Sequence, residues 1–172
     1  MLIESLVKET VELQGFRVIK VAGGVSGLVA MIAPDKRFSP RCGQCGDPAP
    51  YRDTRPQRRF RHVPMWGIPV ELRYSPRRVS CPQCDGVHVE AMPWVSGKQR
   101  MTRALMVTLA TWTRVLPWKQ VAQLFRCAWG TVATAVDEAV AAQRVEDEMV
   151  AYYEQRDVLE QDAIDEAVAA QR

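Results

Sequence analysis

The chain has 172 residues, of which 47% are hydrophobic and 25% are charged, with a formal net charge of +3. This length and apolar content suffice to bury the core of one domain or two small ones, which excludes wholesale disorder. No apolar run approaches the roughly 18 residues that a membrane-spanning helix needs, and the first residues lack the pattern of a secretory signal. We therefore expect a cytoplasmic protein without a membrane partner.

Charge is distributed unevenly along the chain. Residues 37–78 hold ten Arg against three acidic residues, a net charge of +7, whereas residues 137–172 hold eleven acidic against three basic residues, a net charge of −8. A strongly basic middle segment indicates a polyanionic partner rather than a particular fold.

The first half of the chain is predicted to form short β-strands. Residues 16–21 and 28–33 are apolar and β-leaning, and the Gly-rich segment between them is typical of a hairpin turn. Residues 35–56 contain four prolines and are expected to lack regular structure. Residues 70–74 alternate apolar and polar side chains, which predicts a strand that pairs with residues 77–80 after the turn Ser75-Pro76.

The second half is predicted to be helical. Apolar residues recur at three- and four-residue spacings from Met101 to Val115. Pro117 is expected either to end that helix or to begin the next one. Residues 121–125 are predicted to form a short second helix, and residues 129–153 a longer third helix. Residues 135–144 recur almost unchanged at 163–172, which we interpret as a duplicated acidic helix because two copies are too few for a repeat architecture.

Four of the five cysteines form two Cys-x-x-Cys pairs, Cys42 with Cys45 and Cys81 with Cys84. In a reducing compartment such pairs bind metal more often than they form disulfides. Structural zinc takes four soft ligands in a tetrahedron, and a two-residue gap lets one turn present two thiolates to one ion. We therefore predict one structural zinc ion with no open coordination position. The alternatives are reduced core cysteines or a redox dithiol.

Three other residues could take part in metal binding. His88 and His62 are alternative ligands, although each is better explained as a surface or hydrogen-bonded histidine. Cys127 stands alone between predicted helices and is expected to be a small buried apolar residue.

Two segments point to nucleic acid. The Arg-rich run is interleaved with Tyr51, Phe60 and Trp66, and guanidinium groups bind phosphates bidentately, although a solvated charged face is the alternative. Residues 119–136 have the pattern of a helix-turn-helix, whose second helix would enter the major groove, with an ordinary helical hairpin as the alternative. The DNA-binding residues predicted on these grounds are Arg52, Arg55, Arg58, Arg59, Arg61, Arg77, Arg78, Trp129, Thr131 and Thr134.

The order of these features resembles the ISL-three family of insertion-sequence transposases. The resemblance covers roughly residues 10–145, and it is carried by the two cysteine pairs, the Arg-rich run, residues 67–74 and 77–80, and then residues 100–103 and 121–136. It implies a zinc-binding domain and a helix-turn-helix that recognise the terminal inverted repeats of the element, and it adds Arg100 and Arg103 to the DNA-binding residues. In that family these modules precede a catalytic domain whose acidic residues bind divalent metal. No such domain fits after residue 145, so we expect DNA recognition without strand transfer, and no enzyme.

These inferences predict an α+β protein in four segments. They are an N-terminal β-hairpin lead-in (1–34), a small β-rich zinc-ribbon-like module (35–96), a helical helix-turn-helix module (97–145) and an acidic helical tail (146–172). The expected partner is double-stranded DNA, and the protein is expected to associate with the nucleoid. It is also expected to form a homodimer or to bind a full-length transposase. The alternatives are a zinc-stapled protein-interaction or oligomerisation module and a stand-alone transcriptional regulator.

Overall fold

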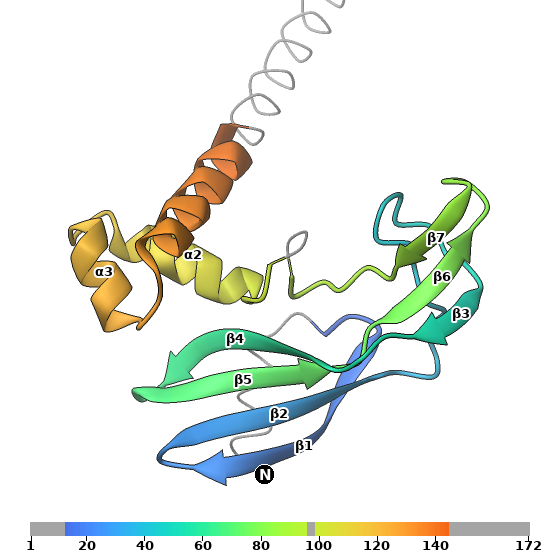
Figure 1. Cartoon of the computed structure of the whole chain (residues 1–172), viewed down its shortest axis with the longest axis horizontal. Helices are drawn as coiled ribbons and strands as arrows, with labels where there is room; N and C mark the ends of the chain where they lie inside the picture. The colour runs from blue at the N-terminus through green and yellow to red at the C-terminus, as the bar shows by residue number, and fades with distance from the viewer. Residues whose placement is uncertain (1–12, 96–98, 145–172) are drawn as a thin grey trace, which may run out of the picture. The chain divides into compact units, whose positions relative to one another are not determined.

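The computed structural model describes residues 13–95 and 99–144 (Figure 1). The predicted acidic tail and the second copy of the duplicated segment lie outside these residues. The chain divides into two compact units, Met1–Thr108 and Leu109–Arg172, and each is described by itself. No helix in the described part of the chain is long and apolar enough to cross a membrane. The combination of strands and helices agrees with the predicted α+β class.

The first unit contains a four-stranded sheet in the order β1-β2-β5-β4. Strands β1 (Phe16–Gly24) and β2 (Gly27–Pro34) form the predicted antiparallel hairpin, which is confirmed. Strand β2 runs parallel to β5 (Ile68–Tyr74), and β5 forms an antiparallel hairpin with β4 (Arg58–Met65). The hairpin of the predicted lead-in therefore shares one sheet with residues 58–74. The segment boundaries at 34, 96 and 145 stay a prediction.

Strand β4 falls in the Arg-rich run, where sequence analysis predicted no strand. Its side chains nevertheless alternate, because Phe60 and His62 are 1% and 2% exposed whereas Arg59 and Arg61 face solvent. The turn to β5 has positive φ angles at Trp66 (50°) and Gly67 (77°). Positive φ at both central positions is what a type I′ hairpin turn requires, and this turn matches the twist of the two strands.

The core of the first unit covers one face of this sheet. Its strand residues are Ala30, Ile32, Phe60, Leu72 and Tyr74, joined by Trp94 and Val95 from the segment after the last strand. The rings of Phe16, Tyr74 and Trp94 meet edge to face, with centroids 4.7–5.5 Å apart. Such aromatic pairs stabilise by about 0.5–1.5 kcal/mol beyond the area they bury.

A second sheet of three short strands holds the cysteine pairs. Its order is β3 (Tyr51–Thr54), β6 (Arg77–Cys81) and β7 (Gly86–Val89), and both pairings are antiparallel. Strand β3 lies within residues 35–56, which were predicted to lack regular structure, and β7 was not predicted either. Both short strands pair with β6, and neither has a run of alternating apolar and polar residues long enough to have predicted it from sequence.

The predicted pairing of residues 70–74 with residues 77–80 is wrong. Residues 70–74 belong to β5 and pair with β2 and β4, whereas residues 77–80 belong to β6 and pair with β3 and β7. The physical reason is Pro76, whose φ is restricted to about −65°, so that Ser75-Pro76 cannot form the I′ turn of a tight hairpin. The chain instead passes from one sheet to the other at this point.

A buried carboxylate ties the two sheets together at this crossing. The side chain of Glu90 is 1% exposed and accepts hydrogen bonds from the Tyr74 hydroxyl, from the Arg77 backbone N–H at 2.7 Å and from Arg77 Nε at 2.7 Å. Burial raises the pKa of Tyr74, as does the adjacent Glu90 anion. The hydroxyl therefore stays protonated and acts as the hydrogen-bond donor to Glu90. Both carboxylate oxygens are satisfied, as a buried charge requires.

The helices begin after the second sheet. Helix α2 spans Arg103–Trp112. Within the second unit, α3 spans Trp118–Leu124. A further helix begins at residue 129 and continues through residue 144, the last residue that the structure describes. Of the two roles expected for Pro117, the structure shows the start of a helix, because Pro117 is the residue that precedes α3. Val121 and Val132, one on each of the last two helices, are both 0% exposed.

We expect the Leu72→Ala substitution to destabilise the protein by about 2–5 kcal/mol, because it removes a side chain that is 0% exposed and leaves a cavity in the sheet's core. Urea unfolding of the zinc-loaded protein measures this loss. The matched control is Ile19→Ala on β1, where the side chain is 55% exposed, and its effect should stay within about 0.5 kcal/mol. Equal losses from the two variants would contradict the assignment of the core.

Candidate metal centre

The first cysteine pair lies in a turn that precedes β3. The backbone N–H of Cys42 donates to the Asp47 carbonyl at 2.8 Å, and that of Gly46, with φ of +79°, donates to the Cys42 carbonyl at 2.9 Å. Gly43 faces strand β7 so closely that a Cβ there would lie 2.6 Å from the Val89 carbonyl oxygen. Glycine at this position therefore allows the turn to dock against β7.

The second cysteine pair forms the turn between β6 and β7. Cys81 is the last residue of β6 and pairs with Gly86, and Cys84 lies in the turn that joins the two strands. Asp85 completes the turn with a φ of 44°, a left-handed conformation that Asp tolerates better than most residues. The antiparallel ladder thus aims two sulfurs back toward the first turn.

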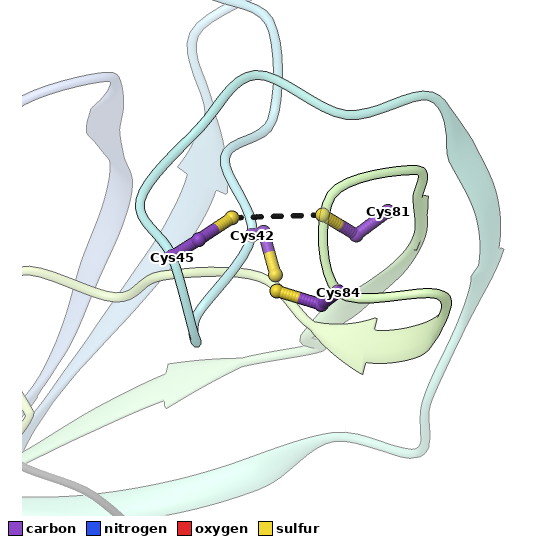
Figure 2. Close-up of side chains that lie close together, drawn as sticks. All are labelled: Cys42, Cys45, Cys81 and Cys84. Atoms are coloured by element: carbon purple, nitrogen blue, oxygen red, sulfur yellow. Dashed lines mark hydrogen bonds between the residues drawn. The ribbon is translucent and has the colours of Figure 1, made fainter.

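All four thiols converge on one point. The four Sγ atoms lie within 4.8 Å of one another, and those of Cys45 and Cys81 are 3.5 Å apart (Figure 2). A tetrahedral zinc ion with Zn–S bonds of about 2.3 Å places its sulfurs about 3.8 Å apart, so this cluster has the size of a zinc site. No disulfide joins these cysteines. The donor set and its geometry fit one structural zinc ion, as the sequence predicted.

The electrostatics of the cluster also favour a cation. Burial opposes ionisation of the Cys42 thiol, but the backbone N–H groups of Cys45 and Gln44 that point at its sulfur outweigh burial and lower its pKa to about 7. The neighbouring Cys45, together with desolvation, raises the pKa of Cys84 to about 12. Adjacent thiols resist simultaneous ionisation because their negative charges repel one another. A divalent cation among them removes this conflict by stabilising all four thiolates.

The other candidate ligands lie apart from the cluster, which comprises only the four cysteines among the described residues. His62 is 2% exposed in β4, and its Nδ1 forms a 2.9 Å hydrogen bond with the Thr102 hydroxyl. His88 belongs to β7, opposite Val79. Cys127 is half-buried. His62 is therefore a hydrogen-bonded core residue, in agreement with the sequence interpretation.

The predicted DNA-binding arginines have different surroundings. Arg52 and Arg55 are exposed on and after β3, and Arg59 and Arg61 are exposed on β4, where Arg58 is half-buried. These five residues share one stretch of the first unit.

Two further arginines already hold carboxylates. Arg77 binds the buried Glu90 through a 2.6 Å ion pair. Arg78 Nε donates to Asp53 at 2.7 Å across the β3–β6 pair, and this carboxylate, with its pKa lowered by Arg78, stays ionised. Both guanidinium groups therefore support the second sheet directly, and their contact with phosphate stays a prediction.

The remaining predicted residues lie near the helices. Arg100 is exposed, and Arg103 is the exposed first residue of α2. In the second unit, Trp129 is 58% exposed with its ring centroid 5.6 Å from that of Trp118. The Thr134 hydroxyl donates to the Gly130 carbonyl at 2.9 Å, one turn earlier in the same helix, and the side chain of Thr131 is half-buried.

Glu90 is the residue that supports the centre and that sequence analysis did not identify. It follows β7, its side chain anchors Arg77 at the start of β6, and the backbone bridge between Cys42 and Glu90 ties the first cysteine turn to the second sheet. A single acid between Val89 and Ala91 carries no signal in sequence, because nothing local shows that its partner lies thirteen residues earlier.

Comparison with known proteins gives the same picture of the centre. Residues 39–84, which include all four cysteines, match the family described as the zinc-finger of transposase IS204/IS1001/IS1096/IS1165. The chain is 31% identical over 93 residues to the transposase for insertion sequence element IS1001 of Bordetella parapertussis, covering 54% of this chain and 23% of that protein. It is 34% identical over 117 residues to the transposase for insertion sequence element IS1557 of Mycobacterium tuberculosis, covering 67% of this chain and 26% of that protein.

The resemblance to insertion-sequence transposases of the ISL-three type, inferred from the cysteine and arginine pattern, is confirmed by these matches. The matched region spans about a quarter of the length of the curated relatives. No solved structure matches the chain. The family match and the four-cysteine cluster together identify one structural zinc ion in this centre.

We expect Cys81→Ser to abolish stoichiometric zinc binding, because it removes one of four ligands and disrupts the turn between β6 and β7. Metal analysis of the purified protein should give about one zinc per chain for the unchanged protein and far less for the variant. The matched control is Cys127→Ser, a cysteine outside the cluster, which should retain its zinc. Zinc retained by the Cys81 variant would rule out the four-thiolate site.

Protonation of His62 should destabilise the fold. Burial lowers the pKa of His62 from 6.5 to about 4, so between these values the unfolded chain binds a proton that the folded chain does not. Stability therefore falls as the pH decreases from 6.5, by about 2 kcal/mol at pH 5 at 1.36 kcal/mol per pH unit. Urea unfolding at pH 7 and pH 5 measures the loss.

The variant His62→Asn keeps a polar atom near the position of Nδ1 for the Thr102 hydroxyl but has no proton to gain. It should lose about 2 kcal/mol less than the unchanged protein between the two pH values. Because both proteins hold the same zinc site, its own acid sensitivity cancels in the comparison. An equal loss in both would show that His62 does not titrate as expected.

Proposed function

We propose that this chain is a zinc-stabilised DNA-binding protein, equivalent to the DNA-recognition part of an insertion-sequence transposase, that recognises the terminal inverted repeats of its element. The observation that carries the proposal is the four-cysteine centre, because it lies within the residues that match the transposase zinc-finger family. A four-thiolate zinc has no open position for water or substrate. The metal therefore supports a binding surface, and the proposal assigns this chain no strand-transfer chemistry.

The surface that supports DNA binding in the first unit is the Arg-rich stretch from β3 to β4. Arg52, Arg55, Arg59 and Arg61 are exposed, and a planar guanidinium matches a phosphate with two parallel hydrogen bonds. Contacts with phosphate fix the position of a protein on the duplex but carry no sequence information. We assign these residues to that positioning role.

Sequence recognition is assigned to the two helices of the second unit. The short connection after α3 contains Arg126 with φ of +48°, in the conformation that glycine commonly supplies at such turns. The Cys127 N–H donates to the Ala122 carbonyl at 2.9 Å and closes the end of α3. The following helix begins at residue 129, so its first turn carries the residues that a helix-turn-helix presents to the major groove.

Each predicted base-contacting residue has chemistry for that role. Trp129 is exposed, and its ring contacts that of Trp118 at a tilt of 37°, with the centroids 5.6 Å apart. The Thr134 proton is used within the helix, so its methyl group and its oxygen remain for contact with a thymine methyl or a base donor. Thr131 lies between them in sequence, and Arg100 and Arg103 precede and begin α2, where we assign them to phosphate.

Selection of binding sites from a randomised duplex pool, followed by a salt titration on selected and scrambled DNA, tests the proposal. We expect an enriched motif, bound roughly a thousandfold more tightly than scrambled DNA, and steep salt dependence on both. The Trp129→Ala variant should lose most of this preference while keeping its salt dependence. The Arg55→Gln variant should keep the preference, and its negative slope of log K against log salt should become shallower by about one.

Two results would contradict the proposal. Salt-sensitive binding without an enriched motif would leave only the arginine surface in contact with DNA and remove the recognition role from the helices. Absence of binding at low salt would favour the other reading of the sequence, a zinc-stapled interaction or oligomerisation module.

A further inference from the structure

The outer face of the four-stranded sheet carries a row of cations that crosses all its strands. In the observed register Lys20 on β1 lies opposite Met31 on β2, Met31 lies beside Arg73 on β5, and Arg73 lies opposite Arg59 on β4. The face on which these side chains lie is the one opposite the core. Lys20 and Arg59 are exposed, and Met31 and Arg73 are half-exposed.

A β-bulge places Lys20 in this row. Val18 pairs with Ile32 and Lys20 pairs with Met31, so Ile19 is an extra residue in β1. Val18 and Val21 both pack against the core although they are three residues apart, which strict alternation would not allow. The bulge reverses the alternation between them, and Lys20 therefore points to the outer face instead of the core.

The surrounding positions make the face strongly basic. Arg17 lies opposite Ala33 on the same side, and Arg61 lies opposite Glu71 one row away from Arg59. The outer face of these strands thus holds five cations and one carboxylate. These residues are Arg17, Lys20, Arg59, Arg61, Arg73 and Glu71.

This arrangement is unfavourable for the isolated sheet. Arg59 and Arg73 are directly opposite each other, and like charges in that position destabilise a strand pair. Glu71 compensates for one of them, because its Oε1 accepts from Arg73 Nε at 2.7 Å. A polyanion bound to this face would offset the repulsion that remains.

We propose that the outer face of the β1-β2-β5-β4 sheet binds the phosphate backbone of double-stranded DNA through Lys20, Arg59 and Arg73. Three strand spacings separate β1 from β4, about 14 Å, which is close to the roughly 12 Å width of the major groove. Cations at the two edges of the sheet therefore reach phosphates on both sides of a groove. This inference rests on the proposed function and adds Lys20 and Arg73, which lie outside the Arg-rich stretch and outside the helices, to the DNA-binding surface.

The test measures binding of the zinc-loaded full chain to a scrambled duplex by fluorescence anisotropy at several salt concentrations. Lys20→Gln should make the negative slope of log K against log salt shallower by about one, and the double variant with Arg73→Gln by about two, because each lost phosphate contact removes about 0.9 from the magnitude of the slope. Lys36→Gln is the matched control, since Lys36 is an exposed lysine in the loop after β2, and its slope should equal that of the unchanged protein.

A second variant tests the same face through a gain of binding. Glu71→Gln removes the one carboxylate of the face and releases Arg73, so binding at low salt should tighten by about threefold, a gain that a purely structural role would not produce. Circular dichroism and zinc content confirm that each variant is folded.

The outcomes separate this inference from the function on which it rests. If the unchanged protein binds DNA while the Lys20 and double variants keep its slope, or while Glu71→Gln does not tighten binding, the sheet face is not a DNA surface and the proposed function stands. If the unchanged protein does not bind DNA even at low salt, the proposed function fails, and this inference fails with it.

Discussion

The zinc-binding cluster is the constraint on which the second sheet depends. Strands β3 and β7 have four residues each and β6 has five, so this sheet has little apolar surface of its own. Its buried cluster consists of Cys42, Ala49, Val79 and Cys81, which means that two of the four members are metal ligands. Small modules of this kind require a disulfide or a metal because hydrophobic burial alone does not offset the entropy of ordering the chain. Zinc supplies that stabilisation by joining two turns that lie far apart in sequence.

The buried Glu90 connects the zinc-binding sheet to the larger sheet. The residue receives hydrogen bonds from Tyr74 at the end of β5 and from Arg77 at the start of β6, and it also bridges to Cys42. This connection matters for the proposed function, because the exposed arginines of β3 and β4 belong to different sheets. Their relative positions are held by a buried charge and a metal instead of by one continuous ladder, and the DNA-binding function that we propose would need such fixed positions to match a regular array of phosphates.

Several elements were predictable because their signals are local. The two cysteine pairs identify their ligands by spacing alone, the β1–β2 hairpin has two apolar runs around a Gly-rich turn, and Pro117 marks the start of α3. Strand β4 was missed because its arginines hide the alternation of Phe60 and His62, and the basic row on the outer face was missed because Lys20, Arg59 and Arg73 are scattered in sequence. Only the register of the sheet, including the bulge at Ile19, brings them into one line.

The sequence by itself determined the ligands of the zinc ion, the basic character of the middle segment, the first hairpin and the succession of helices. Each of these depends on residues within a few positions of one another, where spacing and chemical type are sufficient. The tertiary structure decided which strands pair, that residues 70–74 and 77–80 belong to different sheets, that Arg77 and Arg78 hold Glu90 and Asp53, and which cations share a face. These features depend on contacts between distant residues, whose cost in chain entropy and gain in buried area are settled only when the whole core forms.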